Sequence, residues 1–108
     1  MNYKSYEHGN FTVIQLEGEI DLSNSSEVRD AVLDVLSKKR NLVVDLEAVS
    51  YIDSSGIASL VEGYQTAKDK NLEFGLANIS EVALDVLQLA HLDKVFPIRA
   101  SAKDYLQP

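Results

Sequence analysis

The residues best suited to chemistry are Asp53, Ser54, Ser55 and Gly56, which lie where an apolar, strand-like run gives way to a helical pattern. Of the two hydroxyls between the carboxylate and the glycine, one could act as a nucleophile or be phosphorylated, and both could help to form an anion-binding site or a tight turn. A purely structural interpretation is also open, because Asp and Ser are among the commonest residues at helix starts. With Asp53 as N-cap, we expect its carboxylate to accept a hydrogen bond from the amide of Ser55 or Gly56.

The two serines are predicted to differ in exposure, because a helix turns by about 100° per residue. The apolar stripe that follows them consists of Ile57, Leu60, Val61, Tyr64 and Ala67. Relative to this stripe, Ser54 is expected to lean toward the core and Ser55 to face solvent. Ser59 and Glu62 fall on the same outward side as Ser55, and Gly56 leaves space beside it. A partner protein is therefore predicted to approach Ser55, Gly56, Ser59 and Glu62.

A hydroxyl on the first helical turn lies near unpaired amides and the positive end of the macrodipole, where a phosphate would find donors. This chemistry fits a phosphate acceptor. An independent hydrolase would need a histidine base, and His8 and His91, the only histidines, have no recognisable partner pattern. The sequence also lacks a G-x-S-x-G elbow, a Walker loop and a dinucleotide fingerprint. We therefore predict no catalytic residue, no cofactor and no enzyme activity.

The first half of the chain alternates strand and helix patterns. A polar run around Tyr3 and Tyr6, the turn pair Gly9-Asn10 and the segment "FTVIQLEG" predict a β-hairpin, with Ile20 able to continue the second strand. Asn24, with Glu27 three residues later, predicts the start of a helix that runs to about residue 39. The run "NLVVDL", residues 41–46, predicts a central strand covered on both faces.

The second half continues the alternation. A helix is expected from Asp53 to near Asn71, and an alternating strand over residues 72–77. The segment "NISE" predicts a capped third helix, "KVFPI" a short extended piece, and Ser101 with Asp104 a short last helix. These elements predict an α/β fold: one domain over residues 1–108 with a mixed, mostly parallel sheet, an N-terminal hairpin and about four helices.

Composition narrows the function further. The 108 residues suit one domain with its own core, and 17 acidic against 10 basic residues give a net charge of −7, which disfavours nucleic acid and anionic membranes as partners. The absence of cysteine excludes disulfides and thiolate zinc sites. An apolar leader and a run long enough to span a bilayer are also missing, so we expect a cytoplasmic protein. Glu17, Glu19 and Asp21 could together attract a cation, but a solvated acidic edge is favoured and no metal site is predicted.

The segments "GEIDLSNSSEVRDAV", "NLVVDLEAVSYIDSSGIASL" and "LAHLDKVFPIRAS" resemble the anti-sigma factor antagonists, whose fold is the STAS domain, over nearly the whole chain. The resemblance implies that Ser55, the second serine of Asp-Ser-Ser-Gly, is phosphorylated by a partner serine kinase that is also the anti-sigma factor. It implies that a serine phosphatase of the PP2C type removes the phosphate. Unphosphorylated protein would bind the kinase and displace a sigma factor, and phosphorylation would release it. Asp53, Ser54 and Gly56 would support the phosphorylation site.

Two further points remain open on the sequence. The family's aspartate that matches Asp21 lies near the phosphorylation site and affects kinase recognition or phosphate transfer, whereas a turn-capping role before Asn24 is equally consistent with the sequence. The alternative function is a STAS-domain scaffold or complex subunit without reversible phosphorylation, as in some lipid-transport or stress-signalling assemblies. We expect a monomer or a weak dimer.

Overall fold

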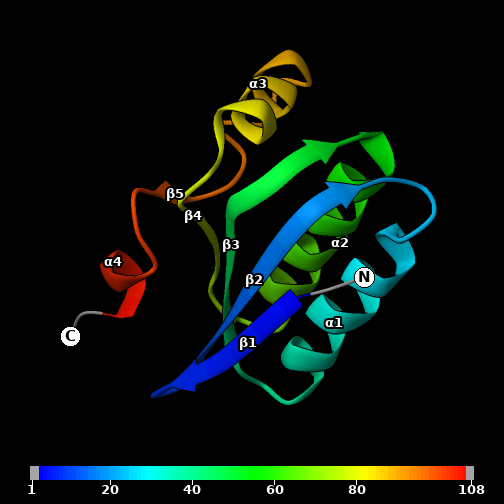
Figure 1. Cartoon of the computed structure of the whole chain (residues 1–108). Helices are drawn as coiled ribbons and strands as arrows, with labels where there is room; N and C mark the ends of the chain where they lie inside the picture. The colour runs from blue at the N-terminus through cyan, green and yellow to red at the C-terminus, as the bar shows by residue number, and fades with distance from the viewer. Residues whose placement is uncertain (1–2, 107–108) are drawn as a thin grey trace.

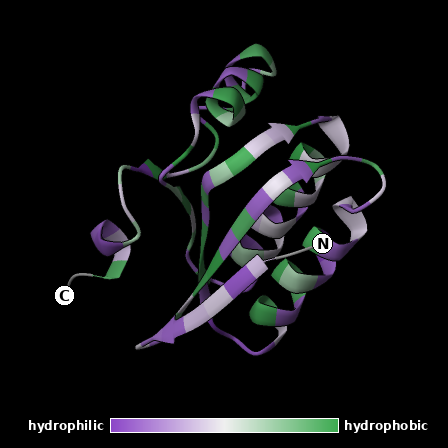
Figure 2. Cartoon of the chain, viewed as in Figure 1, coloured by the Kyte–Doolittle hydropathy of each residue, from purple (hydrophilic) through white to green (hydrophobic). Residues whose placement is uncertain are grey.

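Gly9 and Asn10 reverse the chain between β1 (Tyr3–His8) and β2 (Phe11–Ile20), which pair antiparallel as the predicted hairpin. Gly9 has a φ of +60°, a conformation that glycine adopts without strain. The computed structural model describes residues 3–106. All six residues of β1 are exposed, and Figure 2 shows this edge strand without hydrophobic colour.

Parallel pairing extends the sheet from β2 through β3 (Asn41–Ile52) and β4 (Phe74–Ala77) to β5 (Ile98–Arg99). The strand order is β1-β2-β3-β4-β5, so the sheet is mixed and mostly parallel, as predicted. β3 is central and continues to Ile52, six residues beyond the predicted run, because Val49 and Ile52 also point into the core. Its carboxyl end leads directly into the Asp-Ser-Ser-Gly segment.

Helices cover the two faces of the sheet unequally (Figure 1). The main core forms under α1 (Ser25–Ser37), α2 (Ser54–Asp69) and α3 (Glu81–Leu89), whereas α4 (Lys103–Leu106) closes a smaller cluster on the opposite face. The largest fully buried side chains are mostly leucine and isoleucine, namely Ile14, Leu16, Ile20, Leu36, Leu42, Leu46, Ile52, Leu60, Leu76 and Leu87. The predicted α/β class and the order of elements are confirmed.

Three local predictions need correction. α1 ends at Ser37 rather than near Lys39, which already has a φ of +60°. β4 is buried at all four positions instead of alternating, because both faces of the sheet are covered there. Asn24 precedes α1, but its side chain does not cap the helix. Its amide donates to the Glu19 carbonyl at 2.8 Å instead, which braces the preceding loop.

Candidate functional site

Asp53 is the N-cap of α2, as predicted, and its backbone is extended before the helix begins. One carboxylate oxygen accepts hydrogen bonds from the Ser55 amide at 2.9 Å, the Gly56 amide at 3.3 Å and the Ser55 hydroxyl at 2.6 Å. This last donor, more than any other group, lowers the pKa of Asp53 below its ordinary value, and the amides of Gly56, Ser55 and Leu22 act in the same direction against partial burial. The cap therefore holds an ionised carboxylate against the Ser55 hydroxyl.

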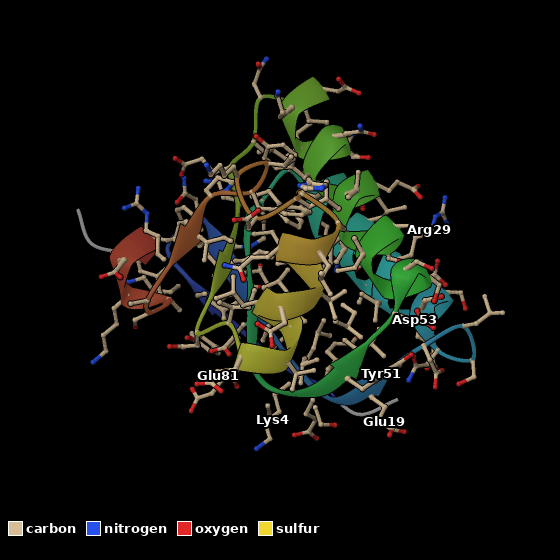
Figure 3. All side chains as sticks on the ribbon, turned by 90° about the horizontal axis from the view of Figure 1, so that it is seen from above. Lys4, Glu19, Arg29, Tyr51, Asp53 and Glu81 are labelled. Carbon is tan, nitrogen blue, oxygen red and sulfur yellow. The ribbon has the colours of Figure 1, made fainter. Side chains whose placement is uncertain are left out.

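The strand ends place this cap next to the loop between β2 and α1. The Asp53 amide donates to the Ile20 carbonyl at 3.1 Å, which continues the pairing of β2 with β3. In the view from above in Figure 3, Asp53 lies at the start of α2, with Tyr51 and Glu19 on the adjacent strand ends. Leu22 in the loop is 81% exposed. The site thus combines a helix start, two strand ends and one loop.

The predicted contrast between the serines is wrong. Ser54 is exposed, whereas Ser55 is only partly exposed, and its hydroxyl is engaged by Asp53. The prediction failed because it took the large apolar residues of α2 as the centre of the buried face. Small residues spaced three or four apart mark that centre instead, because Gly56, Ser59 and Gly63 are buried. Ile57, Leu60 and Ala67 of the predicted stripe are buried as expected.

Gly56 does not clear the approach of a partner, contrary to the prediction. A Cβ at this position would lie 2.7 Å from Cγ2 of Ile20 and 2.8 Å from Cγ1 of Ile52, both buried in the core. The glycine therefore lets the first turn of α2 pack directly on the ends of β2 and β3. Because Gly56 is buried, it does not form part of an accessible docking surface.

Ser59 is also buried rather than outward, with 7% of its surface exposed. Its hydroxyl lies 3.0 Å from the Ser25 carbonyl and 3.2 Å from the Ser55 carbonyl, so the two oxygens share its single proton. The side of α2 that bears Ser59 faces α1, so it cannot present Ser59 to another protein. Ser59 instead joins the start of α1 to the turn that carries Ser55.

Glu62 remains accessible at the edge of this contact. Arg29 of α1 donates from Nε to both carboxylate oxygens of Glu62 at 2.9 and 3.0 Å, and its Nη2 lies 2.9 Å from Oε2. The hydrogen bond and the charge of Glu62 raise the pKa of Arg29. Nearly half of each side chain is exposed, so a partner would meet Glu62 as one half of an ion pair.

Asp21 has the turn-capping role that the sequence allowed. Its carboxylate accepts from the amide and hydroxyl of Ser23 at 2.9 and 2.5 Å, and its backbone amide donates to the Asn24 side chain at 2.9 Å. Since Asp21 follows Ile20, which bonds to Asp53, this loop is held beside the N-cap. The capping role does not exclude a contribution to phosphorylation, which stays a prediction.

Sequence reasoning missed an apolar groove between α2 and α3. It has a volume of about 820 Å³, and Ser54 lines it together with Ile57, Val61 and Leu92. Leu89 also lines it and is 82% exposed. The spacing of Ser54, Ala58, Val61 and Gln65, three or four residues apart, indicates only that they share one side of α2.

Over residues 3–106, no three or more His, Cys, Asp or Glu residues are grouped so that they could hold a metal ion. Two irregularities in the pairing of β2 with β3, at Gln15/Glu17 and at Gly18/Glu19, interrupt the regular alternation of Glu17 and Glu19. Within the same described part of the chain, none of the helices has the length and apolar character needed to cross a bilayer.

Comparison with known proteins identifies the class. A model of the STAS domain matches residues 2–105, and the chain belongs to this family, as the sequence predicted. A STAS-domain containing protein of Pseudomonas aeruginosa is 31% identical over 90 residues, which cover 83% of this chain and 89% of that protein. The anti-sigma-F factor antagonist RsfB of Mycobacterium tuberculosis is 28% identical over 101 residues, covering 93% and 82%. The crystal structure of an anti-sigma factor antagonist from Mycobacterium paratuberculosis superposes with a TM-score of 0.84 at 26% identity, covering 97% of this chain and 90% of that one.

Proposed function

We propose that this protein is an anti-sigma factor antagonist, a binding module that docks on an anti-sigma factor and is released when Ser55 is phosphorylated. The observation that carries the proposal is the Ser55 hydroxyl, which lies on the first turn of α2 and 2.6 Å from the Asp53 carboxylate. Two relatives that cover most of the chain at 26–28% identity are named anti-sigma factor antagonists, which supports the same role.

Phosphorylation would change this site in a defined way. A kinase would transfer the γ-phosphoryl group of ATP to Ser55 Oγ: the new O–P bond forms as the bond between the γ-phosphorus and the β,γ-bridging oxygen breaks, and ADP leaves. The serine proton passes to a base of the kinase or to solvent, so the hydrogen bond to Asp53 is lost. The phosphate adds a charge of about −1.5 to −2 beside the Asp53 carboxylate. The helix N-terminus offers partial compensation through its amides and dipole. A partner that had closed over the neutral hydroxyl would then face two adjacent negative groups, which favours dissociation.

Partial burial of Ser55 is compatible with modification, because the bond that holds the hydroxyl is local. Asp53 lies two residues away, and no side chain from another element bonds to Ser55 Oγ among the interactions of the described residues. A rotation about χ1 of Ser55 breaks the bond to Asp53 without unfolding the turn. Within the proposal, Asp53 and Asp21 position the site, and Ser55, Ser54 and Glu62 form the accessible part of the docking surface.

The proposed partners are an anti-sigma factor with serine kinase activity and a serine phosphatase of the PP2C type. Because the proposed kinase uses ATP, we propose that the cycle takes place in the cytoplasm. The protein itself would act by binding rather than by catalysis, without a cofactor and as a monomer or weak dimer. Its net charge of −7 disfavours nucleic acid and anionic membrane as direct partners.

The test incubates the purified chain with the cognate anti-sigma kinase and ATP, then locates the phosphate by mass spectrometry. We expect phosphate on Ser55 in the unmodified chain and in Ser54→Ala, and none in Ser55→Ala. Phosphate on Ser54 alone, or on neither serine with an active cognate kinase, would contradict the proposal. The Ser54→Ala variant is the matched control because Ser54 is adjacent and exposed but makes no bond to Asp53.

A STAS-domain scaffold without reversible phosphorylation is the second candidate. The same hydrogen bond favours it, because Ser55 already has a structural use in the cap. A scaffold would bind its partner equally well as Ser55→Ala and Ser55→Glu. The switch instead predicts that Ser55→Glu weakens binding to the anti-sigma factor while Ser55→Ala retains it.

A further inference from the structure

We infer that the groove between α2 and α3 is a docking site for a basic amphipathic helix of a protein partner. This inference names the chemistry of a partner at the proposed switch and so rests on the proposed function for its biological meaning. Its physical basis is separate, because it depends on the shape, lining and charge of the groove rather than on Ser55.

The lining of the groove is apolar on both sides. Ile57, Ala58 and Val61 contribute from α2, and Val86, Leu89 and Ala90 contribute from α3 and its C-cap. Leu89 is 82% exposed, so an occupant that covered it would remove most of its apolar surface from water, which is favourable. Ala58 and Ala90 are exposed and small, which lets the backbone of an occupant approach.

The dimensions suit a helix. The α2 side extends from Ser54 to Gln65, which at 1.5 Å per residue is about 17 Å, or about three turns. A third helix laid between two others completes a layer by ridges-into-grooves packing, with its apolar residues at i, i+3, i+4 and i+7. Figure 3 shows α2 and α3 next to each other on the surface that also carries Asp53.

The charge of the protein around the groove favours a basic partner helix. Glu81 and Asp85 are exposed on α3, which has no basic residue, although neither lines the groove. Glu62 lines it from α2, but its charge is paired with Arg29, so the preference for a basic occupant rests on the acidic residues of α3 and the net charge of the chain. Basic residues of the α3 region, His91 and Lys94, lie only beyond the end of that helix. The net charge of −7 opposes a second copy of this chain and an anionic lipid surface as occupants. Lysine or arginine flanking an apolar stripe is the complementary pattern.

Continuity with the proposed switch gives the groove a role. Ser54 lines it, and the adjacent Ser55 lies at the same helix start. A helix seated in the groove would end close to the Asp53 cap. Binding energy would come from the groove, and phosphorylation of Ser55 would act on one end of the bound segment.

The test uses a synthetic peptide of about twelve residues, with leucines on one helical face and lysines elsewhere. Proton–nitrogen correlation spectra of the labelled full chain should show shifts confined to residues lining the groove. A peptide with glutamate in place of lysine, and a scrambled peptide of the original composition, should bind at least about tenfold more weakly. Equal binding of the three peptides, or shifts centred elsewhere such as β1, would overturn the inference.

Variants locate the contact. Ala58→Lys and Leu89→Lys place a repelling charge in the groove at exposed positions, and each should weaken binding of the basic peptide about tenfold or more. Val82→Lys is the matched control, since Val82 is exposed on the same helix but does not line the groove, and it should bind normally. Equal effects of all three variants would contradict the inference.

Two other occupants are tested in the same experiment. Groove shifts that grow with protein concentration alone would assign the groove to a second copy, and shifts produced by zwitterionic lysolipid but not by the peptide would assign it to lipid. Either result overturns the inference. Phosphorylation of Ser55 is measured separately, so peptide binding without phosphorylation rejects the proposed function alone. Phosphorylation without peptide binding rejects the groove inference alone.

Discussion

Gly56→Ala distinguishes the two explanations for a glycine in the first turn of α2. If Gly56 only cleared space for a partner, alanine would stabilise the helix by about 1 kcal/mol, because glycine is the poorer helix former. The structure predicts the opposite sign. A Cβ at Gly56 would come within 2.7 and 2.8 Å of side-chain carbons of Ile20 and Ile52, which are 0% and 2% exposed.

The expected magnitude follows from these contacts. Carbon atoms prefer separations of about 3.5 to 4.0 Å, so each contact is about 1 Å too short. Both neighbours are β-branched with restricted χ1 angles, which places the cost near the upper part of the range for overpacking, about 2 to 3 kcal/mol. Subtracting the gain in helix propensity leaves a net loss of about 1 to 2 kcal/mol in the free energy of unfolding.

Urea unfolding followed by circular dichroism measures this loss, and the melting temperature should fall by roughly 5 to 10 °C. Ala58→Gly serves as a control, because Ala58 is exposed in the same helix and should lose about 1 kcal/mol through propensity alone. A Gly56→Ala protein that is more stable than the unmodified protein would refute the packing argument. It would also restore the interpretation of Gly56 as part of the docking surface.

Three further changes test the packing and charge of the structure. Ser59→Ala removes the buried hydrogen bonds to the carbonyls of Ser25 and Ser55 and should cost about 1 kcal/mol in urea unfolding; unchanged stability would show that this link is not formed. Asp53 has a lowered pKa, so its contribution to stability is present above about pH 4 and is lost as pH falls through the folded-state pKa. Asp53→Asn should therefore show a smaller fall in urea midpoint between neutral and low pH than the unmodified protein does. Burial raises the pKa of Tyr105 from 10.0 to about 12, so stability should fall as pH rises between these values, because the tyrosine ionises first in the unfolded chain. Tyr105→Phe should lack this loss of stability. Identical curves of stability against alkaline pH for the two proteins would contradict this prediction.

The alternation of elements could be predicted because the relevant signals are local. Turn residues at Gly9 and Asn10, the cap at Asp53 and the β-branched run of β3 each favour one structure without reference to distant residues. The cap bond to the Ser55 amide was predicted for the same reason. Secondary-structure propensity, hydrophobic pattern and capping residues agree at these positions, and secondary structure can be predicted from sequence where they agree.

The faces of α2 were harder to predict because burial depends on which neighbours arrive. Gly56 and Ser59 were predicted to face a partner, and no prediction was made for Gly63, yet all three are buried against the closest neighbours of the helix. A Cβ at Gly63 would lie 2.5 Å from Val32 of α1, which shows how near the two helices come. A stripe of small residues is therefore the signal for close packing. The groove likewise requires the placement of α3, which no local pattern supplies.

The central claim is tested most directly by the affinity of this protein for its cognate anti-sigma factor before and after phosphorylation of Ser55. Isothermal titration calorimetry on the two purified forms gives both dissociation constants, with Ser55→Ala treated in parallel with kinase and ATP as the control. Coupled equilibria of this kind typically change affinity by about 5- to 150-fold. We predict weaker binding by the phosphorylated form within that range and no change for Ser55→Ala. Equal dissociation constants for the two forms would contradict the account.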